Sequence, residues 1–147
     1  MTDFLAPSIV LAQPQLGENI GAAARAMANF GLSDLRLVNP RDGWPNPKAQ
    51  AMSVGAGGIL DKARVFDSVA AAIGDLKLVF ATTARDRAVA KPVLTPTEAA
   101  TRLREAARNG IASALMFGGE RSGLENDDVA LADAIITIPV IDVSIKV

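Results

Sequence analysis

Five short apolar runs constrain the fold of this chain more than any other feature. The runs are rich in Val, Ile and Leu, and their apolar residues are continuous rather than alternating with polar ones. Strands buried on both faces of a sheet show this pattern, and parallel strands need helical crossovers such as the alanine-rich stretches between the runs. The sequence therefore predicts an α/β fold with a doubly wound parallel sheet, whose strands are residues 8–13, 35–38, 76–82, 111–117 and 135–138.

Helix-start signals between the runs support these crossovers. Asn46 followed by Pro47 matches an N-cap with proline at the first helical position, and Thr95 with Glu98 matches a capping box. No repeat, charge run or low-complexity linker interrupts the chain, so we expect one domain over residues 1–147. Glycines also fall where helices should end and the chain should turn back into a strand: Gly31, Gly74 and Gly110.

The first helix is expected directly after the first strand, with Asn19 as its N-cap. One face carries apolar residues at helical spacing, and Arg25 points the other way. Arginine on a surface helix is most often solvated, but Ala22 and Ala26 leave room beside Arg25 for another backbone, a subunit or a ligand. The residues expected on the buried face are Ile20, Ala23, Ala24, Met27 and Phe30.

Composition excludes several classes of function. The 147 residues carry a formal net charge of −1 and include neither cysteine nor histidine. Disulfides, thiolate metal sites and Ser-His-Asp triads are therefore excluded, and we predict no metal site. The near-neutral charge argues against a general polyanion binder, so an RNA site would be a local arginine patch. With no signal-peptide pattern and no apolar stretch near the roughly 20 residues of a membrane span, we expect a cytoplasmic protein.

The loops after the strands are the places to look for a site, because ligands of open α/β sheets bind beyond the carboxyl ends of the strands. Gly118 and Gly119 follow the run 111–117 and suit a turn that needs positive φ or a close backbone approach to a ligand, and Glu120 comes next. The plain structural alternative is a strand-to-helix turn with a surface pair of Glu120 and Arg121. The segment lacks the residues of a P-loop or a GxGxxG motif, so a classical phosphate cradle is not expected.

A second loop carries a cluster of cations. Arg85, Arg87 and Lys91 follow the run 76–82, with Asp86 opposing them. Such loops are often simply solvated, but at a strand end these cations could hold RNA phosphates without reading sequence.

Together these segments resemble the SpoU/TrmH-like branch of the SPOUT RNA 2′-O-ribose methyltransferases. ENIGAAARAMANFGL, residues 18–32, resembles the first family motif and has Asn19, Gly21 and Arg25 in place. MFGGERSGL, residues 116–124, resembles the second. The segments LRLVNPR and TTARDR further resemble the subgroup that methylates nucleotide 32 of the tRNA anticodon loop. The resemblance covers nearly the whole chain and implies an α/β-knot fold with a C-terminal trefoil knot.

The third family motif is only partly matched. ITIPV, residues 136–140, resembles its start, and Ser144 can match the family serine. Lys146 stands where the family has asparagine, and the helix that completes the knot does not follow within the 147 residues. We therefore expect either a truncated SpoU-type domain or an impaired cofactor pocket.

The resemblance implies methyl transfer from S-adenosylmethionine to a ribose 2′-hydroxyl of RNA, with tRNA favoured over rRNA, by a homodimer. Arg25 would contact the RNA and act as a fixed cation that stabilises the alkoxide, because guanidinium is effectively never deprotonated. Asn19 would position Arg25 and the ribose, Glu120 would order the second motif, and Ser144 would complete the catalytic set. The cofactor would be held by Thr82, Gly118, Gly119, Glu120, Ile138 and Val140.

Two other functions stay open from the sequence. The altered third motif favours a non-catalytic RNA-binding or dimerisation module on the same scaffold, and titration with S-adenosylmethionine would separate it from the enzyme. An unrelated nucleotide-binding α/β protein is less favoured, because no phosphate loop is present.

Overall fold

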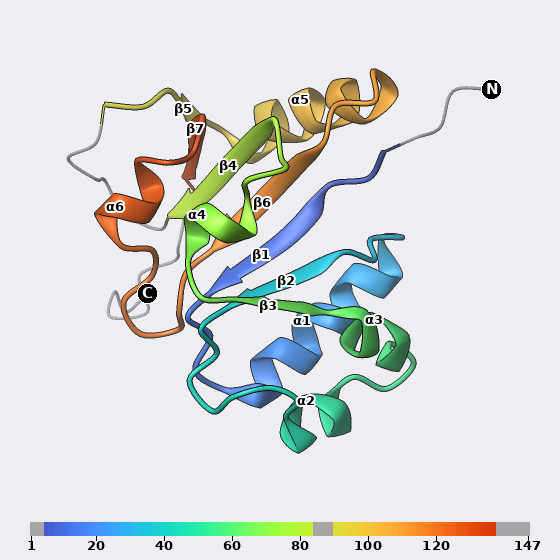
Figure 1. Cartoon of the computed structure of the whole chain (residues 1–147). Helices are drawn as coiled ribbons and strands as arrows, with labels where there is room; N and C mark the ends of the chain where they lie inside the picture. Colours follow the sequence, from blue (N-terminus) through green and yellow to red (C-terminus); the bar gives the residue numbers. More distant parts are fainter. Residues whose placement is uncertain (1–4, 84–89, 138–147) are drawn as a thin grey trace, which may run out of the picture.

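One parallel sheet organises the chain (Figure 1). The computed structural model describes residues 5–83 and 90–137. Within these residues seven strands are paired in the order β3-β2-β1-β6-β4-β7-β5, and every pair is parallel. The strands are β1 (Ser8–Ala12), β2 (Leu35–Val38), β3 (Arg64–Phe66), β4 (Leu78–Thr83), β5 (Val93–Leu94), β6 (Ser113–Phe117) and β7 (Ala134–Thr137). The predicted doubly wound α/β fold is confirmed.

Helices cover both faces of the sheet, as parallel crossovers require. One face packs against α1 (Gly17–Asn29), α3 (Gly57–Lys62) and α5 (Pro96–Arg108), and α2 (Pro47–Met52) packs against α1. The other face packs against the short helices α4 (Val69–Ala72) and α6 (Asn126–Val129). On the first face, β1 and β6 lie between α1 and α5 (Figure 1), and their side chains Leu11, Leu115 and Phe117 are only partly buried.

The five predicted strands are all present, and 35–38 has the predicted bounds. Two further strands, β3 and β5, were not predicted. Both are short and lie at the two edges of the sheet, where side chains meet solvent; Val93 of β5 is 62% exposed. A strand of this kind lacks the continuous apolar run that identifies the central strands.

Two predicted helix starts are confirmed in atomic detail. The Asn46 side chain accepts a hydrogen bond from Lys48 N at 2.9 Å, with Pro47 in the first turn of α2. Thr95 and Glu98 form the capping box, with reciprocal bonds of 3.0 and 3.1 Å. These caps satisfy amide groups that the first helical turn leaves without partners.

Two expectations about α1 are wrong. The helix begins at Gly17 and its N-cap is Leu16, so Asn19 lies inside the first turn rather than capping it. Phe30 is 80% exposed instead of buried. It is the C-cap residue of α1, where the backbone has left the helical conformation, so the helical spacing that aligned Phe30 with Met27 no longer applies.

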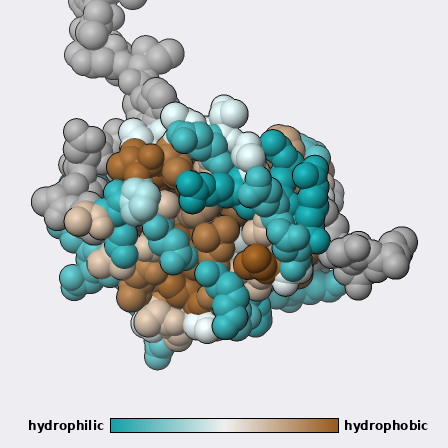
Figure 2. Space-filling view, turned by 90° about the horizontal axis from the view of Figure 1, so that it is seen from above, coloured by the Kyte–Doolittle hydropathy of each residue, from teal (hydrophilic) through white to brown (hydrophobic). Residues whose placement is uncertain are grey.

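Seen from above, the molecule presents apolar side chains in the middle of a hydrophilic face (Figure 2). Val93 on the edge strand and Leu131 after α6 are among the exposed large apolar residues of the chain. Among the helices that the structure describes, none is long and apolar enough to cross a membrane.

A buried arginine, Arg36, links several segments near the amino ends of the strands. Arg36 on β2 is 4% exposed and faces α4, where it donates to the Ala72 carbonyl at 2.7 Å. Its guanidinium also binds the carboxylates of Asp34 and Asp75. The network lies at the edge opposite the carboxyl ends of the strands, so it holds the scaffold without entering the candidate site.

Candidate functional site

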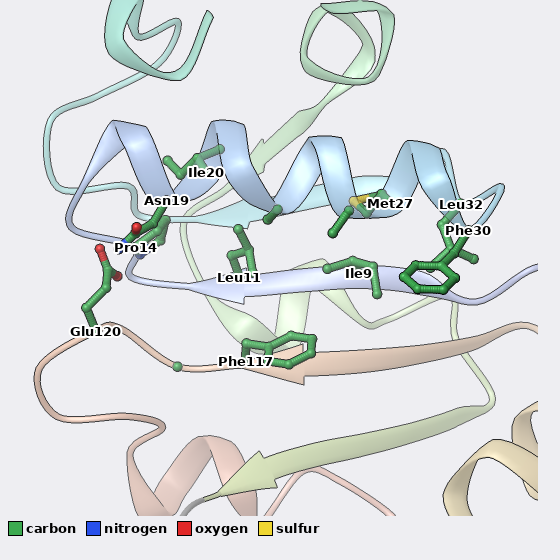
Figure 3. A pocket seen from close by; sticks show the side chains of 13 residues that line it. Ile9, Leu11, Pro14, Asn19, Ile20, Met27, Phe30, Leu32, Phe117 and Glu120 are labelled. Atoms are coloured by element: carbon green, nitrogen blue, oxygen red, sulfur yellow. The ribbon is translucent and has the colours of Figure 1, made fainter. Parts of the chain in front are cut away.

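Glu120 joins the two segments that resemble family motifs. The residue follows β6, and its carboxylate accepts hydrogen bonds from the backbone amides of Gln15 and Leu16, which lie just before α1. The Oε1 to Gln15 N distance is 3.0 Å and the Oε2 to Leu16 N distance is 2.6 Å. The Asn19 side chain also hydrogen bonds to this carboxylate. Figure 3 shows Pro14, Asn19 and Glu120 gathered at one end of a pocket.

This contact holds the turn that leads into α1, whose N-cap residue Leu16 makes no side-chain cap. A helix N-terminus presents free amides and a partial positive charge, and a carboxylate is a favourable partner for both. Burial acts to raise the pKa of Glu120, but the hydrogen bonds from Gln15, Leu16 and Asn19 outweigh it and hold this pKa below its ordinary value. Glu120 is therefore a carboxylate at neutral pH.

The two glycines before Glu120 are required by close backbone packing. A Cβ on Gly118 would lie 2.1 Å from backbone atoms of both Gly123 and Leu124. A Cβ on Gly119 would lie 2.8 Å from the Gln13 carbonyl oxygen at the end of β1. Neither glycine has a positive φ, and the close approach in the structure is of the chain to itself: Gly118 packs on Gly123 and Leu124, and Gly119 brings the β6 loop against the β1 loop. An approach of this backbone to a ligand stays a prediction.

Thr82 lies at the carboxyl end of β4, next to β6 in the sheet. Its Oγ1 donates to the Met116 carbonyl of β6 at 3.0 Å. The structure thus places Thr82 on the strand that neighbours Gly118.

A largely apolar groove of about 360 Å³ runs between α1 and the strands β1 and β6. Asn19 and Glu120 lie at one end and Phe30 and Leu32 at the other (Figure 3). The wall between these ends is apolar: Ile9, Leu11, Ile20, Ala23, Ala26, Met27 and Phe117.

Arg25 lies on a different side of α1 from Asn19. Six residues at 3.6 per turn separate the two by about 120° around the helix and about 9 Å along it. Ala23 and Ala26 line the groove, whereas Arg25 is exposed and is not among the lining residues. The structure therefore brings Asn19 to Glu120 but leaves Arg25 on the outer surface of the same subunit.

Lys91 is also separated from this site. It precedes β5, and three strands lie between β5 and β1 in the sheet, which corresponds to about 19 Å at normal strand spacing. The other predicted cations and third-motif residues fall outside the described residues: Arg85, Arg87, Ile138, Val140 and Ser144.

Sequence reasoning missed one cation and two amides at the site. The amides of Gln15 and Leu16 carry no side-chain signal, so no motif could have identified them as the partners of Glu120. Arg41 follows β2 and its backbone N–H binds the Pro14 carbonyl at 3.0 Å. The signal for Arg41 was its place after a central strand, in the segment LRLVNPR.

Over the residues that the structure describes, no group of three or more His, Cys, Asp or Glu side chains could hold a metal ion.

The chain is similar in sequence to known methyltransferases over most of its length. The chain is 40% identical over 134 residues to the "Uncharacterized tRNA/rRNA methyltransferase LasT" of Escherichia coli, covering 91% of this chain and 58% of that protein. It is 41% identical over 131 residues to the tRNA (cytidine/uridine/adenosine-2′-O-)-methyltransferase TrmJ of Pseudomonas aeruginosa, covering 89% of this chain and 51% of that protein. The chain thus spans about half to three fifths of the length of these relatives.

A solved structure shows the same fold. The crystal structure of TrmJ from Z. mobilis ZM4 superposes with a TM-score of 0.87 at 58% identity, and covers 92% of this chain and 59% of that one. Residues 6–144, which include both motif segments and the loops that meet at Glu120, match the SpoU rRNA Methylase family. The chain belongs to the SpoU methylase family.

Proposed function

We propose that this chain methylates a ribose 2′-hydroxyl of tRNA, with S-adenosylmethionine as the methyl donor. The observation that carries the proposal is the contact of Glu120 with the Gln15–Leu16 turn and with Asn19, because it unites the two family motifs at the carboxyl edge of the sheet. Family membership and the printed names of the relatives support an RNA substrate, and those names favour tRNA over rRNA. The resemblance of LRLVNPR and TTARDR to one subgroup favours nucleotide 32.

The carboxyl ends of β4 and β6 are the place where we expect the cofactor. Thr82 and the pair Gly118–Gly119 lie there on neighbouring strands, and the glycine backbone carries no side chain that would cover it. The groove beside α1 fits the cofactor poorly, because it is polar only at its Asn19–Glu120 end. Ile138 and Val140 would complete the binding residues. When bound, S-adenosylmethionine supplies the methyl group on a positively charged sulfonium.

Arg25 is the proposed cation of the reaction. The ribose oxygen would take the methyl group that the cofactor supplies, and the hydroxyl proton would leave to solvent or an RNA phosphate. A fixed guanidinium stabilises the negative charge that develops on the oxygen and does not need to accept the proton. Asn19, held by Glu120, and Ser144 would position the ribose.

The outward position of Arg25 favours a homodimer in which one subunit supplies Arg25 to the site of the other. Asn19 and Glu120 mark the site within one subunit, and Arg25 points away from them. The apolar groove and the exposed Phe30 give α1 a surface that a second subunit can bury. Sedimentation at micromolar concentration should show a dimer, and a strict monomer would contradict this arrangement.

Methyl transfer to an unmodified tRNA transcript tests the function. Arg25→Ala should lower turnover by about 100-fold or more, the usual effect of removing one oxyanion-stabilising group, and should leave the calorimetric affinity for S-adenosylmethionine nearly unchanged. Asn29→Ala, one turn further along α1 and also exposed, is the matched control and should retain wild-type turnover. Wild-type turnover in Arg25→Ala would disprove the proposed role of Arg25. A wild-type chain that binds no S-adenosylmethionine would instead favour the non-catalytic module.

A further inference from the structure

A backbone hydrogen bond holds Arg41 beside the candidate site. Beyond the ends of β1 and β2 the two loops stay paired, with Gln13 N donating to the Val38 carbonyl at 2.7 Å and Arg41 N donating to the Pro14 carbonyl at 3.0 Å. Pro14 immediately precedes the turn that Glu120 holds. The Cα of Arg41 is therefore fixed relative to Glu120.

Two non-glycine residues in the left-handed region make this pairing possible. Gln13 has φ of 55° and Asn39 has φ of 45°, a conformation that residues with a side chain rarely adopt. The Asn39 side chain donates to the Asp67 carbonyl at 2.9 Å, which stabilises this turn locally. Both loops therefore have a defined conformation at the strand ends, and the backbone of Arg41 is held in place.

The Arg41 side chain, in contrast, is held weakly. It is 54% exposed and pairs with its neighbour Asp42, which is 46% exposed, at 3.1 Å between Nε and Oδ1. Exposed ion pairs of this kind contribute little to stability, because solvent screens both charges. Asp42, and to a smaller extent Glu120, raise the pKa of Arg41, so the guanidinium is charged at every relevant pH. A stronger anion can therefore replace Asp42 at little cost.

The surrounding charges favour a phosphate as that anion. Asp42 lies between Arg41 and Lys48 of α2, whose charge also lowers the pKa of Asp42 after the larger effect of Arg41. Arg41 and Lys48 thus carry two positive charges against the one negative charge of Asp42, and the nearby carboxylate of Glu120 is already bound by the amides of Gln15 and Leu16. Guanidinium presents a planar fork of donors that matches two oxygens of one phosphate.

We propose that Arg41 binds a backbone phosphate of the RNA substrate beside the target nucleotide, and that Asp42 holds the guanidinium in place until the phosphate replaces it. This inference rests on the proposed function, because the phosphate belongs to the RNA that the site methylates. Arg41 positions the RNA and takes no part in methyl transfer itself.

The test measures binding of a fluorescently labelled tRNA transcript by the 147-residue chain as salt is raised. Arg41→Ala keeps the backbone N–H that binds Pro14, so the loop should remain folded. It should weaken RNA binding about fivefold to tenfold and lower the salt slope by about 0.7 to 0.9, the value for one lost phosphate contact. Arg41→Lys should keep the slope, because it keeps the charge. Arg104→Ala on the exposed face of α5 removes the same charge and is the matched control, with slope and affinity near wild type.

Asp42→Asn tests the second half of the proposal. Removing the competing carboxylate should tighten RNA binding about twofold to fivefold, and the gain should shrink in an Arg41→Ala background. Affinity for S-adenosylmethionine should be unchanged in all variants.

Three outcomes overturn parts of this scheme separately. If the wild-type chain methylates tRNA but Arg41→Ala has the slope of Arg104→Ala, the role of Arg41 is refuted and the proposed function stands. If Asp42→Asn tightens binding equally with and without Arg41, the exchange of Asp42 for phosphate is refuted. If the wild-type chain neither binds nor methylates tRNA, the proposed function fails together with this inference.

Discussion

Replacing Glu120 with glutamine should loosen the start of α1 and lower the stability of the whole chain at neutral pH. The carboxylate accepts hydrogen bonds from two backbone amides. A hydrogen bond to a charged group contributes about 1.5–3 kcal/mol to the free energy of unfolding in favourable settings. The carboxylate also faces the positive end of a helix, which adds about 0.3–1 kcal/mol. Solvent reaches the side chain and screens its charge, so the total should fall below the roughly 3 kcal/mol that even the lowest of these values would give. We expect a loss of about 2–3 kcal/mol for Glu120→Ala and about 1–1.5 kcal/mol for Glu120→Gln, which keeps one acceptor oxygen.

The effect should depend on pH with a definite sign. The pKa of Glu120 in the folded chain lies below its ordinary value of 4.5. The stabilisation is therefore complete above the unfolded pKa and is lost as pH falls through the lower folded pKa. The difference in stability between wild type and Glu120→Gln should be constant around neutrality and should shrink below about pH 4.5.

Urea unfolding followed by circular dichroism measures both effects. For a domain of this size, about 1–1.5 kcal/mol shifts the urea midpoint by about 0.5–1 M. Glu105→Gln, on the exposed surface of α5, removes an equal charge and should leave the midpoint near wild type. Equal midpoints for the two variants at neutral pH would show that the Glu120 carboxylate does not stabilise the start of α1. So would a difference that stays constant as the pH is lowered.

Two further substitutions test the scaffold. Gly118→Ala should lower the free energy of unfolding by about 2–3 kcal/mol or more, since its Cβ would lie 2.1 Å from the backbone of Gly123 and Leu124. A Cβ on Gly58 in α3 would meet no atom within 4 Å, so Gly58→Ala should leave this free energy unchanged or raise it by up to about 1 kcal/mol. Equal thermal midpoints for these two variants would contradict the close packing. Arg36→Met should cost about 2–3 kcal/mol, less than for a fully buried pair because both aspartates that it binds reach solvent. A change below about 0.5 kcal/mol by urea unfolding would show that the network contributes little.

The central strands and two helix starts could be predicted because their signals are local. A continuous apolar run, or a capping box such as Thr95 with Glu98, reports the environment of its own residues. The edge strands β3 and β5 could not be predicted, because half-exposed residues such as Val65 and Val93 carry no such signal. Phe30 was misplaced because the periodicity of α1 was extended past the point where the helix ends.

The candidate site could likewise be predicted only in part. Asn19 and Glu120 were identified by resemblance, and the structure places them together. The outward position of Arg25 could be predicted, because the spacing between Asn19 and Arg25 fixes the angle between them on a helix. The turn before α1 could not be predicted, because the carboxylate that holds it comes from Glu120, 104 residues further along the chain than Leu16. Arg41 was missed because its position depends on the pairing of two loops.

The contact of Glu120 with the turn before α1 has a consequence for the order in which the chain folds. The amide of Leu16 and the carboxylate that binds it are 104 residues apart in sequence, so this contact closes a loop that includes most of the described chain. Contacts of such long range form after local ones, because the entropy of loop closure must be overcome first. The first turn of α1 should thus become ordered only when β6 has docked beside β1. On a ribosome, the candidate site would stay unformed until most of the domain had been synthesised.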